Sequence, residues 1–149
     1  MSQEFDHFDA AMATELDRVR MFSHPDLPDG IGLIEFSFRG GNVFVTVEDE
    51  FDTLLSSRML PKASLSHTRP CQSSFWDSFV GKSLVGAWQM TNDRGYPDGI
   101  QMKFRELPNA GAYSIVQMYG EASQITLVEI TPVREVSIRT SDARTNRLA

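Results

Sequence analysis

Apolar residues at every second position on both sides of a glycine pair are the feature that most constrains how this chain can fold. The segment IGLIEFSFRGGNVFVTVED covers residues 31–49 and centres on Gly40 and Gly41. Its alternating apolar positions are Ile34, Phe36 and Phe38 before the glycines and Val43, Val45 and Val47 after them. A period of two is that of a β-strand, and Gly40-Gly41 or Gly41-Asn42 would supply the positive φ of a tight turn. The segment therefore predicts a β-hairpin, which requires an antiparallel sheet.

Apolar residues upstream of this hairpin repeat at intervals of three or four instead. They are Phe5, Phe8, Met12, Leu16, Val19 and Phe22. This spacing puts them on one face of an α-helix, and the acidic residues early and the arginines late in the segment suit the helix dipole. The prolines and the glycine of SHPDLPDG, residues 23–30, cannot continue a helix. The sequence therefore predicts an α-helix over residues 3–22.

Short alternating segments fill most of the second half of the chain. Strands are predicted over residues 83–90, 100–104, 112–119 and 124–130, with Gly120-Glu121 as a hairpin turn and an edge strand near 133–139. Residues 51–60 fit either a short helix or a strand. Residues 61–74 predict an irregular crossing, and residues 73–82 predict one or two helical turns that end at Gly81.

Consecutive strands joined by short turns usually pair with one another. We therefore expect an α+β fold in which the N-terminal helix packs on one twisted antiparallel sheet of about six strands. The sequence leaves open whether this sheet curls into a half-barrel. The length fits a single domain over residues 1–135, followed by an edge strand and a frayed polar tail over residues 136–149.

Charge and cysteine content restrict the partners and the compartment. The net charge is −6, and residues 1–60 carry 12 acidic against 4 basic residues. An acidic chain repels nucleic acid phosphates, so we expect no nucleic acid partner and favour a basic protein surface. The single cysteine, Cys71, cannot form an internal disulfide, which fits a reducing compartment. No apolar run approaches the ~20 residues of a membrane span, and no signal-peptide pattern begins the chain. A cytoplasmic protein without a membrane partner is therefore expected.

The connection between the strands at 83–90 and 100–104 is the main candidate for a functional site. It is rich in turn-forming residues, and Asn92, Asp93 and Asp98 can bond to their own backbone as Asx-turns. A structural turn therefore explains every polar residue in it. As a functional alternative, Tyr96, held between a glycine and a proline, would with Trp88 suit an aromatic anchor for a partner protein. The two carboxylates could instead hold a hard cation, although their spacing excludes an EF-hand.

Four carboxylates fall within five positions at the end of the predicted hairpin: Glu48, Asp49, Glu50 and Asp52. Solvent, a metal ion or a basic partner must offset their mutual repulsion. A solvated strand end is the simplest explanation of such a charge run. A binding role for Glu48, Glu50 and Asp52, which share one side of an extended chain, is the alternative.

Other residues that could carry chemistry show weaker patterns. Cys71 and His67 stand four apart, but Pro70 breaks any helix that would align them as nucleophile and base. The aromatic residues of 75–79 are expected in the core. Motifs for nucleotide binding, a catalytic triad or zinc hydrolysis are lacking. We therefore expect no cofactor, no metal and no catalytic residue.

One sequence motif resembles that of a known family. The matching residues are Trp88, Met90, Thr91, Asn92, Gly95, Tyr96, Asp98 and Gly99, followed by Met102 and Phe104 on an alternating strand. This pattern resembles a family of small bacterial proteins known only as a domain of unknown function, over roughly residues 80–135 of this chain. The resemblance implies no activity. In size and acidity the chain is also similar to immunity proteins of bacterial toxin systems.

Three functions follow as hypotheses. The favoured one is a small cytoplasmic protein-binding module, immunity-like or a partner of an effector or toxin. Its binding residues would be Trp88, Asn92, Asp93, Tyr96, Asp98, Glu48, Glu50 and Asp52. The second is a small-ligand or metal-dependent enzyme that uses Asp93, Tyr96 and Asp98. The third is a self-associating structural protein, a homodimer paired through the edge strand near 133–139.

Overall fold

The computed structural model describes residues 3–48, 52–62, 69–106 and 113–133. In these ranges β-strands dominate and no α-helix forms. The elements are the 3₁₀ helix η1 (Gln3–Ala11) and the strands β1 (Leu16–His24), β2 (Leu27–Phe38), β3 (Gly41–Glu48), β4 (Thr53–Ser57), β5 (Pro70–Cys71), β6 (Ser83–Met90), β7 (Gly99–Arg105), β8 (Tyr113–Glu121) and β9 (Gln124–Val133). Within the same ranges, no helix has the length and hydropathy that crossing a bilayer requires.

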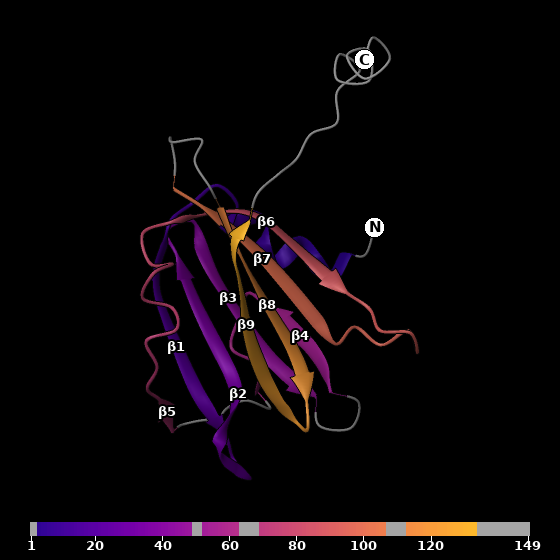
Figure 1. Cartoon of the computed structure of the whole chain (residues 1–149). Helices are drawn as coiled ribbons and strands as arrows, with labels where there is room; N and C mark the ends of the chain where they lie inside the picture. Colours follow the sequence, from indigo (N-terminus) through magenta and orange to yellow (C-terminus); the bar gives the residue numbers. More distant parts are fainter. Residues whose placement is uncertain (1–2, 49–51, 63–68, 107–112, 134–149) are drawn as a thin grey trace, which may run out of the picture.

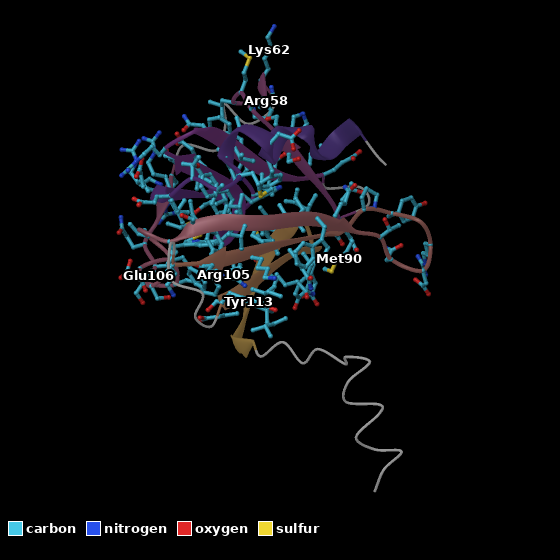
Figure 2. All side chains as sticks on the ribbon, turned by 90° about the horizontal axis from the view of Figure 1, so that it is seen from above. Arg58, Lys62, Met90, Arg105, Glu106 and Tyr113 are labelled. Atoms are coloured by element: carbon cyan, nitrogen blue, oxygen red, sulfur yellow. The ribbon has the colours of Figure 1, made fainter. Side chains whose placement is uncertain are left out.

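The nine strands form one antiparallel sheet that folds into two layers (Figure 1). One layer contains β5, β1, β2, β3 and β4 in that order, and the other contains β9, β8, β7 and β6. The two layers are joined through β2, where Ile31 pairs with Ile125. Side chains fill the space between the layers when the molecule is seen from above (Figure 2).

The sheet also closes on its other side. Glu15 and Ser83 form an isolated β-bridge, the N–H of Leu16 donates to the carbonyl of Lys82 (2.9 Å), and the N–H of Gly81 donates to the carbonyl of Leu16 (2.8 Å). The start of β6 therefore meets the start of β1, and the sheet curls into a half-barrel. The core between the layers contains Phe8, Leu16, Met21, Ile34, Phe36, Phe38, Val43, Val45, Leu54, Trp76, Phe79, Leu84, Ile100, Met102, Phe104, Val116, Met118 and Ile125.

The expected α+β fold, with a helix over residues 3–22, is wrong. Residues 3–11 form a 3₁₀ helix, the backbone turns at Ala13 with a φ of 62°, and residues 16–24 are strand β1. A period-two alternation was present from Arg18 to Met21, but the wider three- and four-residue spacing of apolar residues concealed it.

A β-bulge explains why the strand pattern in β1 is broken. The register with β2 shifts between Leu16 and Arg18. Such an extra residue changes which side chains face the core. Leu16 and Met21 are an odd number of residues apart, yet both are buried. In a regular strand these two residues would face opposite sides of the sheet. Because the bulge places them on the same side, the spacing of the buried residues in β1 also fits one face of a helix.

The predicted hairpin is confirmed, but the reason for its glycine is different. β2 pairs with β3 from Leu33 opposite Thr46 to Phe38 opposite Gly41, and neither Gly40 nor Gly41 has a positive φ. A Cβ at Gly40 would lie 2.1 Å from the carbonyl oxygen of Ala10. Glycine is therefore needed there because η1 packs directly against the turn.

The turn between β8 and β9 shows the same relationship. The prediction placed the turn at Gly120-Glu121, whereas it consists of Ala122 and Ser123, with φ values of 52° and 64°. A Cβ at Gly120 would lie 1.9 Å from the carbonyl oxygen of Asp52. Gly120 therefore permits close contact between the two layers.

The remaining predictions have mixed outcomes. The strands predicted over 83–90, 100–104, 112–119 and 124–130 are confirmed as β6 to β9, and residues 51–60 contain strand β4. Residues 74–81 form hydrogen-bonded turns instead of a helix, and Gly81, with a φ of 92°, ends them as expected. The crossing at 61–74 contains the short strand β5. The tail over 136–149, and the predicted edge strand beyond Val133, lie outside the described residues.

Candidate functional site

The connection between β6 and β7 is a loop organised by the side chain of Asn92. Its Oδ1 accepts hydrogen bonds from the N–H groups of Arg94 (2.9 Å) and Tyr96 (3.1 Å), and its Nδ2 lies 3.3 Å from Oδ2 of Asp98. The backbone closes the same loop, because the N–H of Asn92 donates to the carbonyl of Tyr96 (2.9 Å) and that of Gly95 to the carbonyl of Asn92 (3.0 Å). The predicted Asx-turn at Asn92 is confirmed.

This loop is also held by strands from both layers. The N–H of Leu54 in β4 donates to the carbonyl of Pro97 (3.0 Å), and the N–H of Gly120 in β8 donates to the carbonyl of Asp98 (2.8 Å). These two backbone hydrogen bonds fix Pro97 and Asp98, the part of the loop that leads into β7. The loop is therefore braced, although it lies at the end of the sheet.

Asp52 joins the start of β4 to the β8–β9 turn. Its Oδ1 accepts a hydrogen bond from the N–H of Ser123 at 2.7 Å. The two acidic regions that the sequence treats as separate candidates, the end of the hairpin and the 91–98 loop, therefore lie at one end of the molecule. We name this region the acidic end and define it as Glu48, Asp52, residues 91–98 and residues 120–123.

Negative charge predominates in the acidic end. Its described carboxylates are Glu48, Asp52, Asp93, Asp98 and Glu121, and its described cation is Arg94. Glu48, Asp93 and Glu121 are exposed, whereas Asp52 and Asp98 are half-buried and hydrogen-bonded within the end. The exposed carboxylates can attract an outside cation or a basic protein surface, and the half-buried ones hold the turns together.

The two aromatic candidates lie in different settings. Tyr96 is on the loop and is 38% exposed. Trp88 is also exposed, but it belongs to the outer face of β6, and its ring lies 3.3 Å from where a Cβ of Gly86 would be. The Trp88 ring therefore leans along β6 away from the loop, and the structure does not bring it together with Tyr96 as one anchor.

The carboxylates of the acidic end do not converge on one point. Across the described part of the chain, no group of three or more His, Cys, Asp or Glu side chains could hold a metal ion. Glu50 lies outside the described residues. Asp98, the expected acid or base of the enzyme hypothesis, faces the side-chain amide of Asn92.

The structure adds residues that the sequence prediction missed. Glu121 joins the acidic end because the β8–β9 turn folds against β4. At the opposite end of β7, Nζ of Lys103 lies 3.7 Å and the guanidinium carbon of Arg105 lies 5.1 Å from the centre of the Tyr113 ring. The alternation of residues 100–105 places both cations opposite the core-facing side chains. This alternation could be read from the sequence, but the contact of the two cations with Tyr113 depends on the pairing of β7 with β8.

A groove of about 610 Å³ runs beside β1 and shares no lining residue with the acidic end. Its lining includes Arg18, Arg20, Cys71 and Asp77. Sγ of Cys71 lies 3.4 Å from the hydroxyl of Ser23. The lining mixes both signs of charge, so it does not select a ligand of one sign.

Comparison with known proteins identifies the family to which the chain belongs. No curated protein and no solved structure matches the chain. A family model of unknown function, DUF6334, matches residues 1–134, so the match extends through the N-terminal residues that the resemblance to a domain of unknown function had left out. The chain therefore belongs to this family of unknown function, DUF6334.

Proposed function

We propose that the protein is a small binding module whose acidic end recognises a basic surface of a partner protein. An immunity-like protein, or a partner of an effector or toxin, is the class of protein that fits this role. The proposed compartment is the cytoplasm, in keeping with a free thiol at Cys71. The observation that carries the proposal is a braced loop that presents an exposed Tyr96 among exposed carboxylates.

Preorganisation supports the binding role. Asn92 closes the loop from within, and Leu54 and Gly120 hold it from both layers. A loop that is already ordered loses less conformational entropy on binding than a free one. Tyrosine adds a large contact area with few rotatable bonds, and such residues often dominate binding energy.

Charge supports a basic partner. Glu48 and Asp93 are exposed and do not take part in the described hydrogen bonds that hold the acidic end together. Several exposed carboxylates raise the rate of association with a basic surface, and they make the affinity of the complex depend on salt concentration. Asp52 and Asp98 act by positioning the turns.

Site-specific photocrosslinking tests this proposal. The photoreactive residue p-benzoylphenylalanine replaces Tyr96 in one variant and Val80 in a control, and both are expressed in cells of the source organism. Val80 is 46% exposed and lies before β6, at the end opposite the 91–98 loop. We expect a discrete adduct from position 96 that weakens at high salt and is lacking from position 80. Equal adducts from both positions, or none from position 96, would contradict the proposal.

A further inference from the structure

The β6–β9 layer has an outer face that carries exposed apolar residues at its two sides, on β6 and β9. Ile100, Met102 and Phe104 of β7 face the core and are fully buried, so Gln101 and Lys103 face outward. The strand register places the outward residues in rows that run across the four strands. Apart from Glu121, which also belongs to the acidic end, the proposed function does not use this face.

The central row consists of Trp88, Gln101, Gln117 and Val128, each paired with the next across β6, β7, β8 and β9. Nε2 of Gln101 donates to Oε1 of Gln117 at 2.8 Å, so the glutamines satisfy each other in part. Trp88 and Val128, at the two sides of the row, are exposed. Aromatic residues such as Trp88 are enriched at protein interfaces relative to the rest of the surface.

A basic end lies on one side of this row. The next row contains Lys103, Ile115 and the exposed Ile130, and Arg105 follows along β7 beside Tyr113. Nε of Arg105 is buried and has no hydrogen-bond partner among the described residues. Figure 2 shows Arg105 and Tyr113 toward one end of the lower layer and Met90 toward the other.

Glu106 is also exposed at the basic end, and it follows Arg105 directly in the chain. Strand alternation would direct its side chain away from the outer face. Among the described residues, Lys103 and Arg105 therefore supply the positive charge of the outer face at this end.

An acidic residue lies on the other side of the central row. The row there includes Tyr119 and Thr126, and Glu121 follows at the end of β8. Oγ1 of Thr126 lies 3.5 Å from Oε2 of Glu121, which puts the carboxylate on the same outer face. The outer face is therefore positive at one end and negative at the other, with apolar residues between.

We infer that this outer face is the interface of a homodimer, in which a second copy packs face to face with its strands reversed. A two-fold axis along the central row places the basic end of each copy against the acidic end of the other. Lys103 and Arg105 of one copy then face Glu121 of the second copy, twice by symmetry. The same operation sets Trp88 against Trp88 and Val128 against Val128 at the two sides of the central row, as in aligned packing of two sheets.

The area indicates a weak dimer. Four strands and three rows cover roughly 400 Å² of flat surface per copy, given the usual strand spacing and rise. Two such faces give roughly 800 Å², below the ~1,000 Å² of a specific, stable interface. Association should therefore depend on protein concentration and on salt. The dimer shares Glu121 with the acidic end, but its test is independent of the proposed function, because the test uses the purified protein alone.

Charge reversal tests the dimer. Sedimentation equilibrium is measured over about a 100-fold range of concentration for the wild type, K103E, E121K and the double variant K103E/E121K. Each single variant places like charges opposite each other twice, and we expect it to weaken association about tenfold or more. The double variant restores opposite charges and should associate like the wild type. Thermal unfolding of each variant separates loss of association from loss of fold.

A hydrophobic pair of variants adds a control. V128D puts a charge on the central row of the outer face and should give a monomer, whereas V80D changes a similarly exposed valine before β6 and should leave association unchanged. A wild type that is monomeric at every concentration overturns the inference. So does a dimer that K103E, E121K and V128D all leave intact, because its interface is then another surface, such as the edge strand predicted near 133–139.

Discussion

The carboxylate of Asp52 accepts a hydrogen bond from the backbone N–H of Ser123, with 2.7 Å between Oδ1 and N. Asp52 itself has a φ of 53°, and the carbonyl of the same residue lies against Gly120. One residue therefore joins the start of β4 to the turn between β8 and β9. This contact joins segments that are 71 residues apart in the sequence, and it brings Glu121 into the acidic end.

Replacing Asp52 should lower stability through both of its roles. D52A removes the acceptor and puts alanine at a positive φ, so we expect it to reduce the free energy of unfolding by about 1–3 kcal/mol. D52N keeps an oxygen acceptor and tolerates positive φ, so its loss should be less than about 1 kcal/mol. Urea unfolding of the two variants measures the difference. Equal losses would mean that the negative charge, and not the hydrogen bond, matters.

The glycine of the first hairpin should be intolerant of a methyl group. G40A drives a Cβ toward the carbonyl of Ala10, and overpacking of this kind costs about 1–3 kcal/mol of unfolding free energy. G41A is the matched control, because its Cβ would meet the Ala10 side chain at an ordinary 3.4 Å. Thermal or urea unfolding compares them. If both variants lose the same stability, η1 does not pack on the turn as described.

Asn92 should control the order of the loop more than the stability of the fold. N92A removes the acceptor for the N–H groups of Arg94 and Tyr96, and we expect their amide hydrogens to exchange about tenfold faster. T91A, at the exposed neighbouring residue, is the control and should leave both rates unchanged. Hydrogen exchange followed by NMR measures each amide. Unchanged exchange at Tyr96 in N92A would show that other contacts hold the loop.

The ion pair between Arg20 and Glu35 should contribute to the stability of the fold, because Glu35 is buried whereas Arg20 is exposed. Glu35 is 7% exposed, and Nε of Arg20 lies 2.8 Å from its Oε2. R20A leaves that carboxylate without its described partner, so we expect a loss of about 1–3 kcal/mol in unfolding free energy.

The double variant R20A/E35Q removes the buried charge and should recover part of this loss. R18A changes an exposed arginine two residues earlier on the same strand and serves as the control. Denaturant unfolding reports all three variants. A double variant less stable than R20A would contradict the account.

The sequence predicted those parts of the fold in which local pattern and final contacts agree. The alternation around Gly40 specifies the β2–β3 hairpin, and four further alternating segments specify β6 to β9. The prediction for the N-terminus was wrong because the bulge after Leu16 changes which residues of β1 face the core. Pairing with β2, and not the local pattern, then determines the structure. A three- and four-residue spacing was compatible with both outcomes, and only the long-range pairing separates them.

The candidate site shows the same division. The turn chemistry of Asn92 was readable because each of its bonds falls within six residues. The approach of Asp52 to Ser123, and the resulting inclusion of Glu121, depends on how the two layers meet. Glycines at 40 and 120 were assigned to turns because close backbone contacts leave no local pattern.

Affinity for the partner that position 96 captures, measured as a function of salt, tests the proposed function most directly. Isothermal titration compares the wild type with E48Q/D93N, which neutralises two exposed carboxylates of the acidic end, and with D77N, which neutralises an exposed carboxylate in the turns before β6. We predict that the dissociation constant of the wild type rises about tenfold from low to high salt, that E48Q/D93N removes most of this rise, and that D77N does not. A dissociation constant that is independent of salt, or equally changed by both variants, would contradict recognition through the acidic end.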